Sequence, residues 1–339
     1  MENEDINISK NKDNNIYLTI VVPAYNEEKN IRECILSIFE DLKNVDINYE
    51  VLVINDGSHD RTSEIIRDLM KKYNKLRFID RKENRGYGYT VLEGLKEAKG
   101  NIVLYIDADC VVERGSIYKI VEHYKRGVDA VFGYVDVANP EHLHPLVCKI
   151  GKKYNKESRF GGAMMSFRKE VLKELGGPSL ESGAGYDAEL KYRLKRGKYN
   201  VIYEDQAKVY SKFPTGIKDI LKRKYLAGKS YIVMSSRYPE IFKKGIIIGP
   251  TFYFMFLISI LLFVTTANLY FLITTSILIC IFLVKYTPRA TEIYKESKKI
   301  SFFFLYYIYE FLAGIARSLG YLSELGKFIK LMMAKHNND

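Results

Sequence analysis

The chain has 339 residues and a formal net charge of +11 at pH 7, yet residues 1–211 carry 34 basic and 34 acidic side chains. The positive surplus flanks residues 245–284, a stretch of 40 residues without a charged side chain, which favours lipid headgroups over nucleic acid as the anionic partner. The four cysteines show no metal-type or paired spacing, which argues against a zinc site and a disulfide framework.

The first 15 residues are polar, and we expect them to form a disordered tail rather than a secretory leader. After them, β-rich runs alternate with amphipathic helical patterns. We expect strands at 17–22, 49–54, 76–79 and 102–106, with helices at 27–44, 61–73 and 89–99 between them. This alternation predicts an α/β fold with a mainly parallel sheet covered on both faces. Ligands of such sheets bind at the carboxyl ends of the strands.

Polar and aromatic residues follow the first two expected strands. Pro23 ends the first, and Tyr25 and Glu27 follow it, placed to stack on a base and to accept its hydrogen bonds. An ordinary strand-to-helix turn explains this segment equally well. Asp56, in Asn-Asp-Gly-Ser after the second strand, is placed either to contact a base or ribose or simply to form a turn.

Arg85 lies in Asn-Arg-Gly-Tyr-Gly, just before the third expected helix. Backbone amides and a guanidinium at such a position can approach a diphosphate. The segment lacks the third glycine and the post-strand position of a dinucleotide fingerprint, which disfavours NAD binding.

Asp107 and Asp109 end the most apolar expected strand. Residues two apart in an extended chain point to the same side, so the two carboxylates converge. Such a pair suits Mg²⁺ or Mn²⁺, with the remaining ligands from water and substrate phosphates. A surface turn with two solvated aspartates is the alternative.

The uncharged stretch is long enough for two membrane crossings, which we expect as helices at 246–265 and 269–285. Basic residues outside both ends place them, and the preceding domain, in the cytoplasm by the positive-inside rule. A buried hairpin in a soluble protein is the alternative. The aromatic segment 302–325 contains Glu310, Arg317 and Glu324, which favour a helix in the membrane interface over a third span.

Val-Pro-Ala-Tyr-Asn-Glu, Asn-Asp-Gly-Ser, Asn-Arg-Gly-Tyr-Gly and Asp-x-Asp follow one another in the order seen in family 2 glycosyltransferases, and the chain resembles a membrane-attached member over about residues 18–228. The resemblance implies a GT-A fold. It assigns Tyr25, Glu27 and Asp56 to the nucleoside and Arg85 to the diphosphate region. It assigns Asp107 and Asp109 to the ribose and the metal.

The resemblance also implies inversion by a single displacement, which needs a general base for the acceptor hydroxyl. Asp187 matches that base. Tyr186 replaces the acid that usually precedes it, so Glu189 is a second candidate and helix capping a third explanation. The small-residue segment 161–165 is similar to the acceptor-side strand of the family.

Residues 221–228 lie where processive synthases carry Gln-x-x-Arg-Trp, and the chain has no Trp. This departure favours addition of a single sugar. Arg223 and Lys224 are expected to touch the donor diphosphate or an acceptor lipid phosphate, or to form a face that contacts headgroups.

The sequence therefore predicts a metal-dependent, inverting glycosyltransferase that faces the cytoplasm. It would move one sugar from a nucleotide diphosphate sugar to a polyprenyl-linked or glycan acceptor at the bilayer. A catalytically silent membrane scaffold is the alternative. We expect five divisions of the chain: a tail at 1–15, the GT-A domain at 16–230, a basic juxtamembrane segment at 231–245, two spans at 246–286, and a basic loop, amphipathic or membrane helix and basic tail at 287–339.

Overall fold

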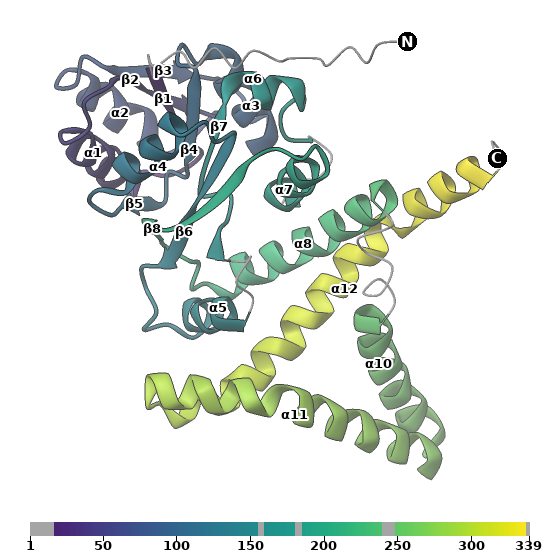
Figure 1. Ribbon diagram of the computed structural model, residues 1–339. Helices are drawn as coiled ribbons and strands as arrows, with labels where there is room; N and C mark the ends of the chain where they lie inside the picture. Colours follow the sequence, from purple (N-terminus) through teal and green to yellow (C-terminus); the bar gives the residue numbers. More distant parts are fainter. Residues whose placement is uncertain (1–16, 155–158, 180–184, 239–247, 337–339) are drawn as a thin grey trace.

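The computed structural model describes residues 17–154, 159–179, 185–238 and 248–336 (Figure 1). The expected N-terminal tail lies outside these ranges, and so do Lys243 and Lys244, the basic residues expected before the first span.

An eight-stranded mixed sheet forms the centre of the N-terminal domain, in the order β3-β2-β1-β4-β7-β6-β8-β5. The first four strands run parallel, as predicted, and β7 pairs antiparallel with both β4 and β6. The strands are β1 (Tyr17–Ala24), β2 (Asn48–Asn55), β3 (Leu76–Asp80), β4 (Ile102–Ile106), β5 (Cys110–Val112), β6 (Ala130–Val137), β7 (Met164–Arg168) and β8 (Val201–Ser211).

Helices cover both faces of the sheet, because successive strand residues alternate between two cores. Ile20, Val51 and Leu104 face one core, with the helices α1 (Ile31–Leu42), α2 (Thr62–Met70) and α4 (Ser116–Lys125). Val21 and Leu52 face the other, with α3 (Tyr87–Glu97), α6 (Lys169–Glu174) and α7 (Tyr186–Arg196). The predicted covered sheet is confirmed.

Four long helices follow: α8 (Ile217–Arg237), α10 (Ile248–Thr266), α11 (Leu269–Ser297) and α12 (Ile300–His336). Figure 1 shows α10, α11 and α12 as the sides of a triangle beyond the sheet, with α8 alongside α12. The helix α8 runs through the expected domain boundary at residue 230.

The expected basic loop from residue 287 is helical instead, because α11 continues past Pro288 to Ser297. Tyr286, Ala290 and Ile293 on this extension are buried against α12 and against α5 (Leu143–Tyr154). The burial of one continuous face therefore keeps the helix intact across a proline, which by itself would favour an end or a kink.

Among the described residues, two helices are long and apolar enough to cross a membrane, Leu269–Ser297 and Ile300–Gly326, whereas Thr251–Thr266 is a shorter apolar helix. This differs from the expected pair of spans, because α12 qualifies although its charges favoured an interfacial helix. Glu310 and Glu324 are buried, and Glu324 pairs with Lys229 of α8 at 2.9 Å. These two carboxylates therefore point toward protein.

Two glycines allow α8 and α12 to cross with their backbones in contact. A Cβ at Gly228 would collide with the carbonyl oxygen of Arg317, and a Cβ at Gly320 would collide with that of Tyr225. Nearby, Tyr306, Tyr309 and Ala313 of α12 join a buried cluster with residues of α5, α8 and α11. The helices α11 and α12 thus pack closely against α5 and α8.

Candidate functional site

A cleft of about 370 Å³ lies at the carboxyl ends of β1, β2 and β4. Seven of the ten predicted site residues line it: Pro23, Tyr25, Glu27, Asp56, Asp107, Asp109 and Arg223. Asn84, Gly86, Tyr87 and Thr90 of the α3 region complete the wall, and Arg85, Asp187 and Lys224 are not among the lining residues.

Asp107 and Asp109 follow β4 at the floor of the cleft. Burial, followed by the charge of Asp109, raises the pKa of Asp107 to about 7, and burial also raises the pKa of Asp109. Two neighbouring desolvated carboxylates favour a cation between them. The residues fit a divalent cation that takes its other ligands from phosphate and water, since the described part of the chain holds no group of three potential ligands.

Three other lining residues, Tyr25, Glu27 and Arg223, offer an aromatic face, a carboxylate and a cation. The side chain of Tyr25 is 43% exposed and thus free to stack. Burial raises the pKa of Glu27. The charge of Asp109 raises this pKa further and the charge of Arg223 lowers it, so the three side chains lie near one another. Within the described residues Arg223 has no ion-pair partner, which leaves its guanidinium available to an anionic ligand.

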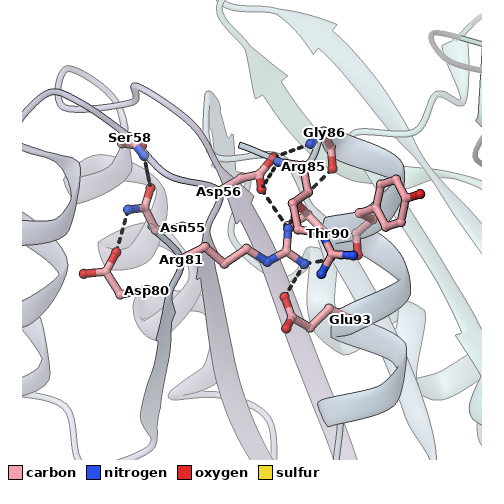
Figure 2. Close-up of polar contacts among 10 residues, drawn as sticks. Asn55, Asp56, Ser58, Asp80, Arg81, Arg85, Gly86, Thr90 and Glu93 are labelled. Carbon is pink, nitrogen blue, oxygen red and sulfur yellow. Dashed lines mark hydrogen bonds and ion pairs between the residues drawn. The ribbon is translucent and has the colours of Figure 1, made fainter. Parts of the chain in front are cut away.

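Asp56 is held by three donors from the protein (Figure 2). Its Oδ1 accepts from Nη1 of Arg81 at 2.7 Å and from the backbone N–H of Arg85 at 2.9 Å, and Oδ2 accepts from the N–H of Gly86 at 2.8 Å. Arg81 also pairs with Glu93. Asp56 therefore fixes the 85–86 turn that lines the cleft, and only part of its hydrogen-bonding capacity remains for a ligand.

Arg81 was not predicted as a site residue from the sequence. It forms an ion pair with Asp56, and only 10% of its side chain is exposed. The available signal was a cation directly after the third strand, at the same sheet edge as Asp56. Arg85, which was predicted to lie near a diphosphate together with backbone amides, has its guanidinium 4.9 Å from the Tyr89 ring centroid. Its backbone N–H donates to Asp56.

We expect an Arg81→Met variant to lose about 3–5 kcal/mol of stability, because it leaves a buried carboxylate without its cation. Nucleotide binding should weaken as well, since the 85–86 turn loses its anchor. Thermal unfolding and nucleotide titration of the purified variant measure the two effects. Arg61→Met is the control, because Arg61 pairs with Glu64 on the exposed surface; equal stability losses in both variants would contradict the assignment.

Lys224 also lies away from the cleft. Its ammonium is 5.8 Å from the ring centroid of Tyr309 on α12, and burial lowers its pKa. Adjacent residues of α8 therefore face different sites, with Arg223 at the cleft and Lys224 at the helix junction.

The first turn of α7 carries both candidates for the base. Glu189 is buried, and it accepts from the N–H of Ser179 at 3.1 Å, from Arg193 at 3.0 Å and from the Tyr238 hydroxyl at 3.0 Å. Asp187 is about a quarter exposed, and its nearest cation, Lys191, is 3.9 Å away. The charge of Asp187 is among the causes that raise the pKa of Asp107, so the two carboxylates lie near each other. Asp187 is thus the carboxylate that remains open to a ligand.

Comparison with known proteins gives two family matches. Residues 19–176 match "Glycosyl transferase family 2", and residues 102–314 match "Glycosyl transferase family group 2". A mannosyltransferase from Pyrobaculum calidifontis, solved with GDP-mannose and Mn²⁺, superimposes with a TM-score of 0.59 at 20% identity, covering 90% of this chain and 86% of that one. This similarity shows the GT-A fold.

Curated relatives match over shorter segments. A dolichol-phosphate mannosyltransferase of Pyrococcus furiosus is 34% identical over 34% of this chain and 32% of its own length. A poly-β-1,6-N-acetyl-D-glucosamine synthase of Staphylococcus epidermidis is 25% identical over 66% of this chain and 57% of its own length. The match therefore spans between about a third and just over half of these relatives. Since one family match, over residues 102–314, covers more than half of the chain, the chain belongs to glycosyl transferase family group 2.

Proposed function

We propose that the protein is a metal-dependent, inverting glycosyltransferase that transfers a single sugar from a nucleotide diphosphate sugar to a membrane-associated, polyprenyl-linked acceptor. The observation that carries this proposal is the cleft at the strand ends, where Tyr25, Glu27, Asp107, Asp109 and Arg223 come together. It joins an aromatic face for a base, carboxylates for a ribose and a cation, and a guanidinium for phosphate.

Each group has a defined task in this proposal. Tyr25 stacks on the base, Arg223 contacts the diphosphate, and Asp107 and Asp109 hold the cation. A bound divalent cation would supply Lewis-acid stabilisation of the departing nucleoside diphosphate. Asp187 takes the proton from the acceptor hydroxyl as that oxygen attacks the anomeric carbon.

The proposed membrane location rests on the apolar helices and on the distribution of charge. The two candidate spans are α11 and the apolar part of α12, and the basic residues 285–299 occupy the last part of α11 and its connection to α12. We propose that these basic residues lie in the cytoplasm, as the positive-inside rule implies, and that the uncharged residues 245–284 cross the bilayer twice, which puts the catalytic domain on the same side. The dolichol-phosphate acceptor in the name of the Pyrococcus relative supports a lipid-linked acceptor.

The test is a donor screen on the detergent-solubilised protein with Mg²⁺ or Mn²⁺, which measures released nucleoside diphosphate with and without lipid extracts. We expect release from one donor, increased by lipid extract. Metal-dependent nucleotide binding without release under any condition would instead favour the silent scaffold.

We expect Asp187→Asn to lower kcat about a hundredfold and to leave donor binding unchanged, because general-base catalysis contributes about 10²–10⁴-fold. The rate with the donor identified in the screen measures this effect. Asp68→Asn is the control, since Asp68 forms an exposed ion pair with Lys71 on α2. Full turnover by Asp187→Asn would remove Asp187 from the mechanism.

A further inference from the structure

Two tyrosines link the acceptor-side helix to the donor-side carboxylate. The Tyr186 hydroxyl, at the start of α7, donates to the Tyr87 hydroxyl at 3.0 Å. The Tyr87 hydroxyl, at the start of α3, donates to Oδ1 of Asp107 at 2.7 Å. The two rings pack with their centroids 4.8 Å apart. A continuous chain of hydrogen bonds thus connects α7 to Asp107.

A second, independent feature of the chain is adapted to this contact. A Cβ at Gly162 would collide with the Tyr186 hydroxyl, whereas one at the neighbouring Gly161 would meet only Val135, at 3.7 Å. The next residue, Ala163, accepts the backbone N–H of Asp107 at 3.3 Å. The small residue beside the cleft floor therefore makes room for the tyrosine that replaces the usual acid.

We propose that Tyr186 and Tyr87 form a positioning bridge that orients Asp107 toward the donor and its cation; this inference rests on the proposed function. Because the bridge occupies Oδ1 of Asp107, it directs Oδ2 to the bound ligand. Tyr87 acts directly on Asp107, and Tyr186 acts only through Tyr87. The bridge also holds α7, which carries Asp187, in a fixed position relative to the donor.

The physical basis is the role of groups that hydrogen-bond to metal ligands. Such partners fix the orientation of the ligand, and their removal typically costs about 10–100-fold in metal affinity or activity. A phenol is neutral where the usual acid would be charged, so Tyr186 adds no further negative charge to a site where the charge of Asp109 already acts on Asp107.

The experiment compares Tyr87→Phe, Tyr186→Phe and the double variant, each of which keeps the rings and removes hydroxyls. The first readout is Mn²⁺ binding by the full-length protein in detergent, measured by electron paramagnetic resonance with GDP or UDP present. The second is the separation of kcat from donor KM. Tyr124→Phe is the matched control, because its buried hydroxyl donates to Ser166 at 2.8 Å on the other face of the sheet.

We expect Tyr87→Phe to weaken Mn²⁺ binding about tenfold, Tyr186→Phe to weaken it less, and the double variant to match Tyr87→Phe. This non-additivity is the signature of residues that act in series. Gly162→Ala should reproduce the Tyr186→Phe defect, whereas Gly161→Ala and Tyr124→Phe should bind Mn²⁺ as the wild type does.

Two results overturn the bridge while the proposed function stands: wild-type Mn²⁺ binding by Tyr186→Phe, or additive losses in the double variant. If the wild type binds no Mn²⁺ with either nucleotide and releases no nucleoside diphosphate from any donor, the proposed function and the bridge fail together.

Discussion

An Asp109→Ala variant is expected to lose about a thousandfold in kcat while its metal-free form unfolds at the same temperature as the wild type or higher. The activity falls because the cation loses one of its two proposed protein ligands, and Lewis-acid stabilisation is worth several kcal/mol. The stability is retained because the substitution removes a desolvated charge that raises the pKa of Asp107. The measurements are nucleoside diphosphate release and thermal unfolding in the presence of a chelator.

A loss of activity without a loss of stability distinguishes a carboxylate that binds a metal ion from one that stabilises the fold. Asp41→Ala is the contrasting control, since the Asp41 carboxylate is buried and accepts from the N–H groups of Gly115 and Ile117. It should lower the unfolding temperature because two buried donors lose their acceptor. A thermal loss in Asp109→Ala as large as that in Asp41→Ala, or activity within tenfold of the wild type, would contradict the metal assignment.

A Gly320→Val variant is expected to separate α8 from α12 and to lose about 3 kcal/mol of stability or more. Its side chain would collide with the backbone carbonyl of Tyr225, which no rotamer change can move. Arg223 lies on the same segment of α8, so kcat/KM should fall about a hundredfold, the effect of displacing a positioning group by about 1 Å.

The same helix supplies the control. Gly326 has open space where a Cβ would lie, so Gly326→Val tests the effect of a β-branched residue without the collision. Thermal unfolding in detergent and donor turnover measure both variants. If Gly320→Val keeps the stability and turnover of Gly326→Val, the close crossing is not needed to position α8.

The sequence predicted the parallel half of the sheet because its strands are apolar runs bounded by turn signals. Ile102–Ile106 appears as expected, and the residues that follow the strands reach one cleft, since the carboxyl ends of parallel strands meet at one edge. The antiparallel β7 could not be predicted in this way, because its pairing depends on partners far apart in the chain.

The contacts of two predicted site residues involve aromatic neighbours. Arg85 meets Tyr89, four residues further along the chain, whereas Lys224 meets Tyr309, which is 85 residues away in the sequence. Glu324 of α12 likewise pairs with the distant Lys229 of α8. The contacts between distant elements depend on how the helices pack, which a local sequence pattern does not show.

The firm packing of α11 and α12 onto α5 and α8 has a geometric consequence. With the apolar helices seated in a bilayer as proposed, the cleft is held at one set height above the lipid surface, because no flexible linker separates Arg223 from the crossing at Gly228. The distance of the cleft from the lipid surface then selects the acceptor. An acceptor is glycosylated only if its reactive hydroxyl lies at that height, and the terminal hydroxyl of a product that is one sugar longer lies beyond the cleft.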